Sequence, residues 1–111
     1  MFRHAAICAM LLLAGCASIT GGPLDGHDPI AAARGRAFAQ ANCAACHAVG
    51  AARQSPNPKA PPFGDIHARY TPAILLSELE VSAIAGHYDM PPLSTTAAER
   101  ADVVAYVMTL K

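Results

Sequence analysis

Apolar side chains recur at helical spacing near the C-terminus of the chain. The positions are Val103, Tyr106, Val107 and Leu110. Spacings of i, i+3, i+4 and i+7 place all four on one helix face, which is typical of a face turned toward a core. Upstream, Thr96 and Glu99 have the spacing of a capping box, in which each side chain bonds a free backbone N–H of the other. The pattern therefore predicts a core-forming helix that begins after Thr96.

A second helix is predicted over residues 30–42, where alanine dominates and helix propensity is high. Asp28 suits the N-cap of this helix and Pro29 its first turn, because proline lacks the N–H that would be left unbonded there. A third, shorter helix is expected from Pro72 to Glu80, with Thr71 before it. Its apolar face holds Ile74, Leu75 and Leu79.

No stretch shows the two-residue alternation of a β-strand. Residues 55–63 contain four prolines and predict an irregular loop, since proline interrupts both helices and central strands. The chain is therefore expected to be all-α, with three to four short helices and long irregular connections.

Composition limits what this fold can be. The 111 residues suffice for one domain, and 8 basic residues balance 8 acidic ones. Apolar residues make up 53% of the chain, too many for a disordered protein, and the charge balance speaks against nucleic-acid binding. However, 25 of the residues are alanine, which buries little area. Something other than protein is expected to fill the middle of the domain.

The first residues predict export. Residues 1–15 carry one arginine ahead of a short apolar run, the layout of a signal peptide. The run ends in Leu13, Ala14, Gly15 and Cys16, which resembles the lipobox of bacterial lipoproteins. The resemblance implies that Cys16 is lipidated and becomes the first mature residue; a plain secretory peptide with an incidental Cys16 is the alternative.

Residues 16–28 read as the lipidated N-terminus and a flexible, glycine-containing tether, and residues 29–111 as the folded domain. Acyl chains on Cys16 would hold this domain at a membrane surface. We therefore expect an exported protein, facing the periplasm and anchored by lipid to a bacterial membrane.

The chemistry of the chain is concentrated at Cys43, Cys46 and His47, which form a C-x-x-C-H motif. Two cysteines three apart can bond the two vinyl groups at one edge of a haem, and the adjacent histidine is delivered to the iron as an axial ligand. The motif predicts one covalently attached haem c.

Three other uses of such a motif fit this chain less well. A structural zinc site needs four ligands, and the mature chain holds no further cysteines except Cys16. A thioredoxin-like dithiol needs a strand before the motif. A disulfide between Cys43 and Cys46 would close a very small loop and stabilise the fold little. Haem attachment fits best.

The second side of the iron needs its own ligand. Met90 precedes Pro91 and Pro92, which stiffen a loop that no helix can pass through, so the thioether can be held in place. Met108 lies near the end of the last helix, where methionine usually fills gaps in a core. His87 is the main rival and His67 a weaker one. We expect His47 and Met90 to be the two metal ligands.

Together these motifs resemble a small class I c-type cytochrome from about residue 30 to residue 110. The resemblance implies a cytochrome c-like fold in which helices and loops wrap around one covalent haem. It also implies that Gly35 and Tyr106 mark the crossing of the first and last helices. The chain departs from the family at Ala39, where an aromatic is usual; Phe38 stands one place earlier.

The family resemblance assigns two further residues to the haem site. The proline-rich loop is expected to give the Pro61 carbonyl to the second nitrogen of His47, which would fix the imidazole tautomer. Phe63 is expected to pack near the porphyrin.

The function implied is that of a one-electron carrier, not an enzyme, passing electrons between membrane-bound or periplasmic redox proteins. Two alternatives stay open: a ligand-binding or peroxidase-like haem protein with a displaceable distal ligand, and a haem relay subunit of a larger oxidoreductase complex. The sequence names neither donor nor acceptor.

Overall fold

The computed structural model describes residue 24, residues 26–87 and residues 89–111. Within this part of the chain there are four helices and no extended strand. The helices are α1 (Pro29–Asn42), α2 (Phe63–Arg69), α3 (Pro72–Ala85) and α4 (Ala97–Val107). An isolated β-bridge joins His87 and Met90. The all-α expectation is confirmed.

The caps predicted for α1 and α4 are present. Asp28 Oδ1 accepts hydrogen bonds from the N–H groups of Ile30 and Ala31, at 2.9 and 3.2 Å. At α4, Glu99 N–H donates to Thr96 Oγ1 at 3.1 Å and Thr96 N–H donates to Glu99 Oε2 at 2.7 Å. Because free N–H groups at a helix start need acceptors, these side chains determine where both helices begin.

The middle of the chain differs from the prediction. Helix α3 continues past Glu80 to Ala85, because no helix-breaking residue occurs before Gly86, which ends it at φ +66°. The seven-residue α2 was not predicted, since its short sequence lacks a recognisable period. Helix α4 ends at Val107, so partly buried Leu110 packs from beyond the helix.

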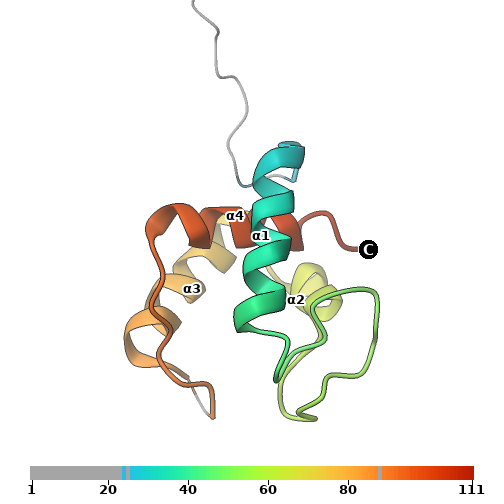
Figure 1. Cartoon of the computed structure of the whole chain (residues 1–111), viewed down its shortest axis with the longest axis vertical. Helices are drawn as coiled ribbons and strands as arrows, with labels where there is room; N and C mark the ends of the chain where they lie inside the picture. The colour runs from blue at the N-terminus through green and yellow to red at the C-terminus, as the bar shows by residue number, and fades with distance from the viewer. Residues whose placement is uncertain (1–23, 25, 88) are drawn as a thin grey trace, which may run out of the picture.

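The fold is organised by the crossing of α1 over α4 (Figure 1). Gly35, in the middle of α1, lies directly against the backbone of α4. A Cβ atom on Gly35 would stand 1.9 Å from the carbonyl oxygen of Asp102 and 2.9 Å from the nitrogen of Val103. No side chain fits in that space, so the crossing requires glycine, as the sequence resemblance implied.

A bidentate ion pair joins the same two helices beside Gly35. Arg34 donates from Nε to Asp102 Oδ2 at 2.6 Å and from Nη2 to Asp102 Oδ1 at 2.7 Å. This hydrogen bonding raises the pKa of the Arg34 guanidinium above its ordinary value. Asp102 is buried, and the pairing supplies the hydrogen bonds that its carboxylate loses on leaving water.

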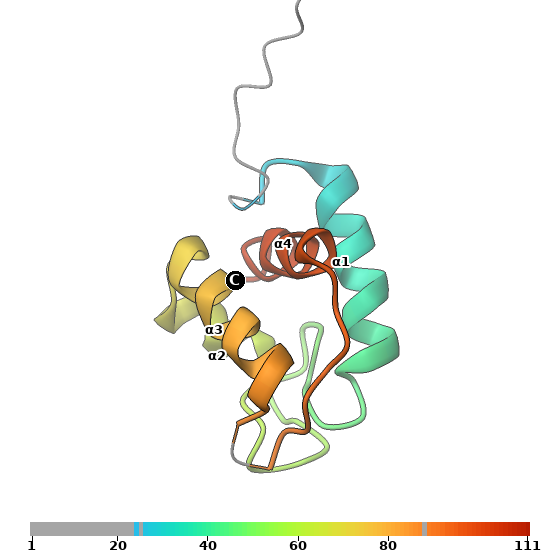
Figure 2. The ribbon, with the colours of Figure 1, turned by 90° about the vertical axis from the view of Figure 1, so that its left-hand side faces the viewer.

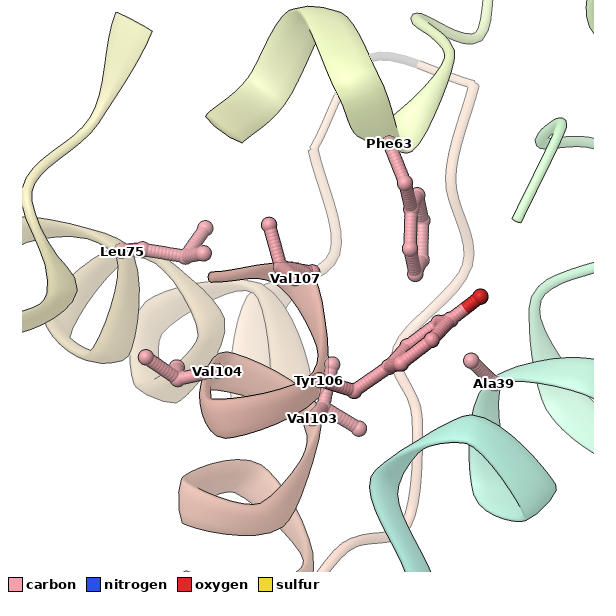
Figure 3. Packing of buried hydrophobic residues seen from close by; sticks show 7 residues of the cluster. All are labelled: Ala39, Phe63, Leu75, Val103, Val104, Tyr106 and Val107. Carbon is pink, nitrogen blue, oxygen red and sulfur yellow. The ribbon is translucent and has the colours of Figure 1, made fainter. Parts of the chain in front are cut away.

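The core lies under this crossing. Its buried members are Ala39, Phe63, Leu75, Val103, Val104, Tyr106 and Val107. Figure 3 shows Phe63 of α2 and Tyr106 of α4 converging beside Ala39 of α1. The small Ala39 side chain is fully buried where the family usually has an aromatic, and partly buried Phe38 packs against the same cluster.

The long loops lie at one end of the molecule. Helix α1 begins at the opposite end and runs toward the segment that connects it to α2 (Figure 1). Figure 2 shows the same arrangement from the side, with the loop between α3 and α4 at the same end as that segment. The last turn of α1 therefore delivers Cys43 to the end of the molecule where the loops gather.

The crossing yields a stability prediction. In Gly35→Ala the added methyl must push α1 away from α4, and overpacking of this kind costs about 1–3 kcal/mol. We expect a lower melting temperature in calorimetry, by about 4–8 °C per kcal/mol. The control is Gly64→Ala in α2, where nothing lies within 4 Å of the new Cβ. Equal stability of the Gly35→Ala protein and the unsubstituted protein would contradict the tight crossing.

Candidate functional site

The C-x-x-C-H motif forms one further turn after α1. The N–H groups of Cys43 and Ala44 both donate to the carbonyl of Ala39, at 2.8 and 3.1 Å, which closes the helix. The carbonyl of Cys43 then accepts from Cys46 at 3.2 Å and from His47 at 2.9 Å. This compact turn holds both cysteines and the histidine in one short segment.

The two cysteines differ in exposure. Cys43 is half-buried and belongs to the rim of the core cluster, whereas Cys46 is exposed. Burial raises the pKa of the Cys43 thiol, because the thiolate loses its hydration there. Neither thiol forms a disulfide. Both are therefore available to bond a prosthetic group.

His47 has a defined orientation. Its Nδ1 lies 2.7 Å from the carbonyl oxygen of Pro61. A carbonyl oxygen can only accept, so Nδ1 carries the proton and donates it to this bond. In this tautomer of the neutral ring the lone pair is on Nε2, the form in which imidazole binds a metal. The contact that the resemblance implied for Pro61 is present.

Phe63 stands beside this imidazole. The two ring centroids are 5.5 Å apart and the rings are inclined at 58°. Phe63 is only 6% exposed, so its ring limits the space in which His47 can turn. Packing and the hydrogen bond to Pro61 act together on one side chain.

The backbone after the motif is tied down by long-range hydrogen bonds that the sequence did not reveal. Asn57 N–H donates to the carbonyl of Cys46 at 3.1 Å, and Phe63 N–H donates to that of Ala48 at 2.9 Å. Ala48 N–H in turn donates to Ser55 Oγ at 2.9 Å. Nothing in the local pattern distinguishes Ser55 or Asn57 from other loop residues, since their roles depend on how the loop folds back.

Tyr106 connects this segment to α4. Its hydroxyl donates to the carbonyl of Val49 at 2.5 Å, while its ring lies in the core. The sequence predicted Tyr106 as a packing residue and missed this hydrogen bond. Through it, the helix crossing and the histidine segment form one connected unit.

Met90 lies on a different loop. Gly86 ends α3 in a left-handed conformation, and a Cβ at this glycine would come within 2.5 Å of the Met90 carbonyl. His87 and Met90 exchange backbone hydrogen bonds of 3.1 and 2.7 Å, and Leu93 N–H donates to the Ala83 carbonyl at 3.2 Å. The backbone on both sides of Met90 is thus held, and its side chain is half-buried.

The structure therefore groups the predicted site residues into two sets. Cys43, Cys46, His47, Pro61 and Phe63 form one cluster at the end of α1. Met90 is held on the loop after α3, and a surface ion pair of 2.9 Å between Lys59 and Asp89 joins the two loops. Because both side chains of this pair are well exposed, it stabilises the arrangement little.

The two histidines considered as alternatives to Met90 lie elsewhere in the structure. His87 is exposed at the start of the Met90 loop, and half-buried His67 is in α2, where its buried Nδ1 has no hydrogen-bond partner. No three His, Cys, Asp or Glu side chains converge as a metal site in the described part of the chain. Cys16 and the signal segment over residues 1–15 lie outside the described residues.

The Tyr106 hydroxyl can be tested by Tyr106→Phe. The substitution keeps the ring but leaves the Val49 carbonyl without its donor, which costs about 1 kcal/mol. We expect a lower midpoint in urea unfolding with an unchanged slope. Tyr70→Phe, at an exposed tyrosine, is the control. A Tyr106→Phe midpoint equal to that of the control would show that the bond contributes nothing.

Comparison with known proteins agrees with this geometry. A family model described as Cytochrome c matches residues 32–111, which is most of the chain. No curated protein and no solved structure matches. The free thiols of Cys43 and Cys46, and His47 with its Nδ1 bonded to the Pro61 carbonyl, fit the thioether and axial bonds of haem c. The chain belongs to the cytochrome c family and carries a covalently bound haem c with iron.

Proposed function

We propose that this haem-based electron carrier uses His47 and Met90 as its two iron ligands, with Cys43 and Cys46 bonded to the porphyrin, and is not an enzyme. The observation that carries the proposal is the hydrogen bond from His47 Nδ1 to the Pro61 carbonyl, next to both cysteines. It holds Nδ1, so that Nε2 is the imidazole nitrogen that would bind the metal.

Several features of the chain would keep the imidazole in place as the charge on the metal changes. The Pro61 carbonyl accepts a hydrogen bond from Nδ1, which would increase the donor strength of Nε2 toward a metal. Phe63 packs against the ring, and the bonds of Ala48 hold the backbone after it. When bound, the haem supplies a one-electron couple between ferric and ferrous iron.

Met90 is the second ligand that the loop supports best. Pro91 and Pro92 follow it, and Gly86 and His87 hold its backbone from the other side. A thioether on a fixed backbone can stay bonded in both oxidation states, so little moves when an electron enters or leaves. With methionine and histidine as its ligands, the iron would have a high reduction potential.

We further propose that the protein is exported and anchored by lipid on Cys16, and that its partners are membrane-bound or periplasmic redox proteins. The support is the apolar run ending in Leu13, Ala14, Gly15 and Cys16. Among the described residues, every helix is too short or too polar to cross a bilayer. Cys46 and Pro61 are exposed, so a partner can approach the loops that carry them.

Met90→Ala tests the ligand assignment. We expect the near-infrared charge-transfer band between methionine sulfur and ferric iron to disappear and the reduction potential to fall, because the thioether stabilises ferrous iron. Spectroscopy and a redox titration of the matured protein measure both.

Met108→Ala is the matched control, because this methionine caps the C-terminal end of α4. We expect it to keep the band. Retention of both the band and the potential in Met90→Ala would overturn the assignment. A high-spin ferric form of the unsubstituted protein would instead favour the ligand-binding or peroxidase-like alternative.

A further inference from the structure

The loop that carries Met90 is held differently on its two sides. This Met90 loop, residues 86–96, connects α3 to α4, and its second half runs back along α3 (Figures 1 and 2). On the N-terminal side, His87 and Met90 exchange two backbone hydrogen bonds. On the other side come Pro91 and Pro92, which have no N–H to donate. The position of Met90 on this side is therefore set by the residues beyond the prolines.

The two prolines make the connection to those residues stiff. Their rings fix the backbone angle φ, and Pro91 also restricts Met90, because a residue before proline avoids the helical region. A shift of the backbone at Leu93 is therefore carried to Met90 and is not absorbed between them. The contacts that fix residues 93–95 also fix Met90.

Packing against α3 gives residues 93–95 little support. A cavity of about 370 Å³ lies between them and α3, and its lining includes Ala83, Ile84, Leu93, Thr95 and Arg100. Ile84 is 83% exposed. A backbone bond of 3.2 Å from Leu93 N–H to the Ala83 carbonyl crosses the gap. Directed bonds, more than packed surface, thus hold this part of the loop.

Arg100 of α4 supplies two such bonds. Its Nη1 donates to the Thr95 carbonyl at 3.0 Å and to Thr95 Oγ1 at 2.9 Å. Arg100 forms no ion pair with any residue that the structure describes, and its buried Nε has no hydrogen-bond partner there. The guanidinium gives up hydration without a counter-charge. What it adds over an apolar side chain is its hold on Thr95.

From these contacts we propose that Arg100 is a positioning residue for Met90. Bonded to Thr95, it fixes the C-terminal side of the Met90 loop to α4, and the stiff prolines pass this position on to the thioether. Tyr106 of the same helix bonds the segment that follows His47. Helix α4 thereby sets the positions of both proposed iron ligands. The inference rests on the proposed ligation of iron by Met90.

Added imidazole tests how firmly the loop holds Met90, because it competes with the thioether for ferric iron. Arg100→Met keeps an unbranched side chain and loses every donor. We expect it to bind imidazole about tenfold more tightly than the unsubstituted protein, since a hydrogen bond from a charged group contributes on that scale. The measurement is a titration of the matured ferric protein, followed by loss of the charge-transfer band between methionine sulfur and iron.

Thr95 offers a milder test that decides the question if Arg100→Met does not fold. Thr95→Val removes the hydroxyl acceptor but keeps the shape of the side chain, and should tighten imidazole binding about threefold. Thr95→Ser keeps the hydroxyl and should have the affinity of the unsubstituted protein.

Two controls separate positioning from charge and from overall stability. Arg36→Met removes an exposed arginine of α1. Asp28→Ala removes the cap at the far end of α1 and lowers the stability of the domain. Both should keep the imidazole affinity of the unsubstituted protein, although Asp28→Ala should melt at a lower temperature.

Equal imidazole affinities of Arg100→Met and Arg36→Met would overturn the inference, as would equal affinities of Thr95→Val and Thr95→Ser. Equal tightening in Arg100→Met and Asp28→Ala would also overturn it, because lower stability of the whole domain would then explain the effect. Absence of the charge-transfer band from the unsubstituted protein would overturn the ligation by Met90, and the inference with it.

Discussion

The close contact between α1 and α4 is the constraint on which the rest of the structure depends. Gly35 allows the backbone of α1 to touch that of α4 at Asp102, and no residue with a side chain could do so without separating the helices. Two hydrogen bonds from Arg34 of α1 to Asp102 of α4 help to orient the two helices at this contact. Because α1 leads straight into Cys43, the crossing also decides where the C-x-x-C-H turn is presented.

A short series of contacts links the crossing of α1 and α4 to the site. Tyr106 lies in the core and bonds the carbonyl of Val49, two residues after His47. The Pro61 carbonyl accepts a hydrogen bond from the imidazole Nδ1, and Phe63 packs against the ring. The histidine is therefore oriented by the protein itself. Such pre-organisation suits an electron carrier, since ligands that need not move add little to the reorganisation accompanying electron transfer.

Local signals in the sequence predicted the parts of this structure that depend on neighbouring residues. The Asp28 cap, the Thr96 capping box and the C-x-x-C-H turn each involve residues within four positions of one another. The fold class followed from the missing strand pattern and from the family resemblance, which also supplied Gly35 and Pro61. These two contacts span many residues, and no local pattern would have indicated them.

The parts that were missed depend on tertiary folding. Helix α2 is too short to show a period, and its start at Phe63 is secured by a hydrogen bond to Ala48. The Ser55 and Tyr106 hydroxyls find their acceptor or donor only when the loop folds back toward α4. Leu24 was expected to be part of a flexible tether, and only the structure shows it packed against the core.

The central claim is that the Cys43 to His47 turn holds the haem through thioether bonds. The most direct measurement is a haem-stained denaturing gel of protein matured during export, followed by mass spectrometry of the peptide containing residues 43–47. The account predicts that the stain stays with the polypeptide under reducing conditions and that this peptide carries the haem mass. A colourless band from matured protein, or haem that separates from the chain on denaturation, would contradict it.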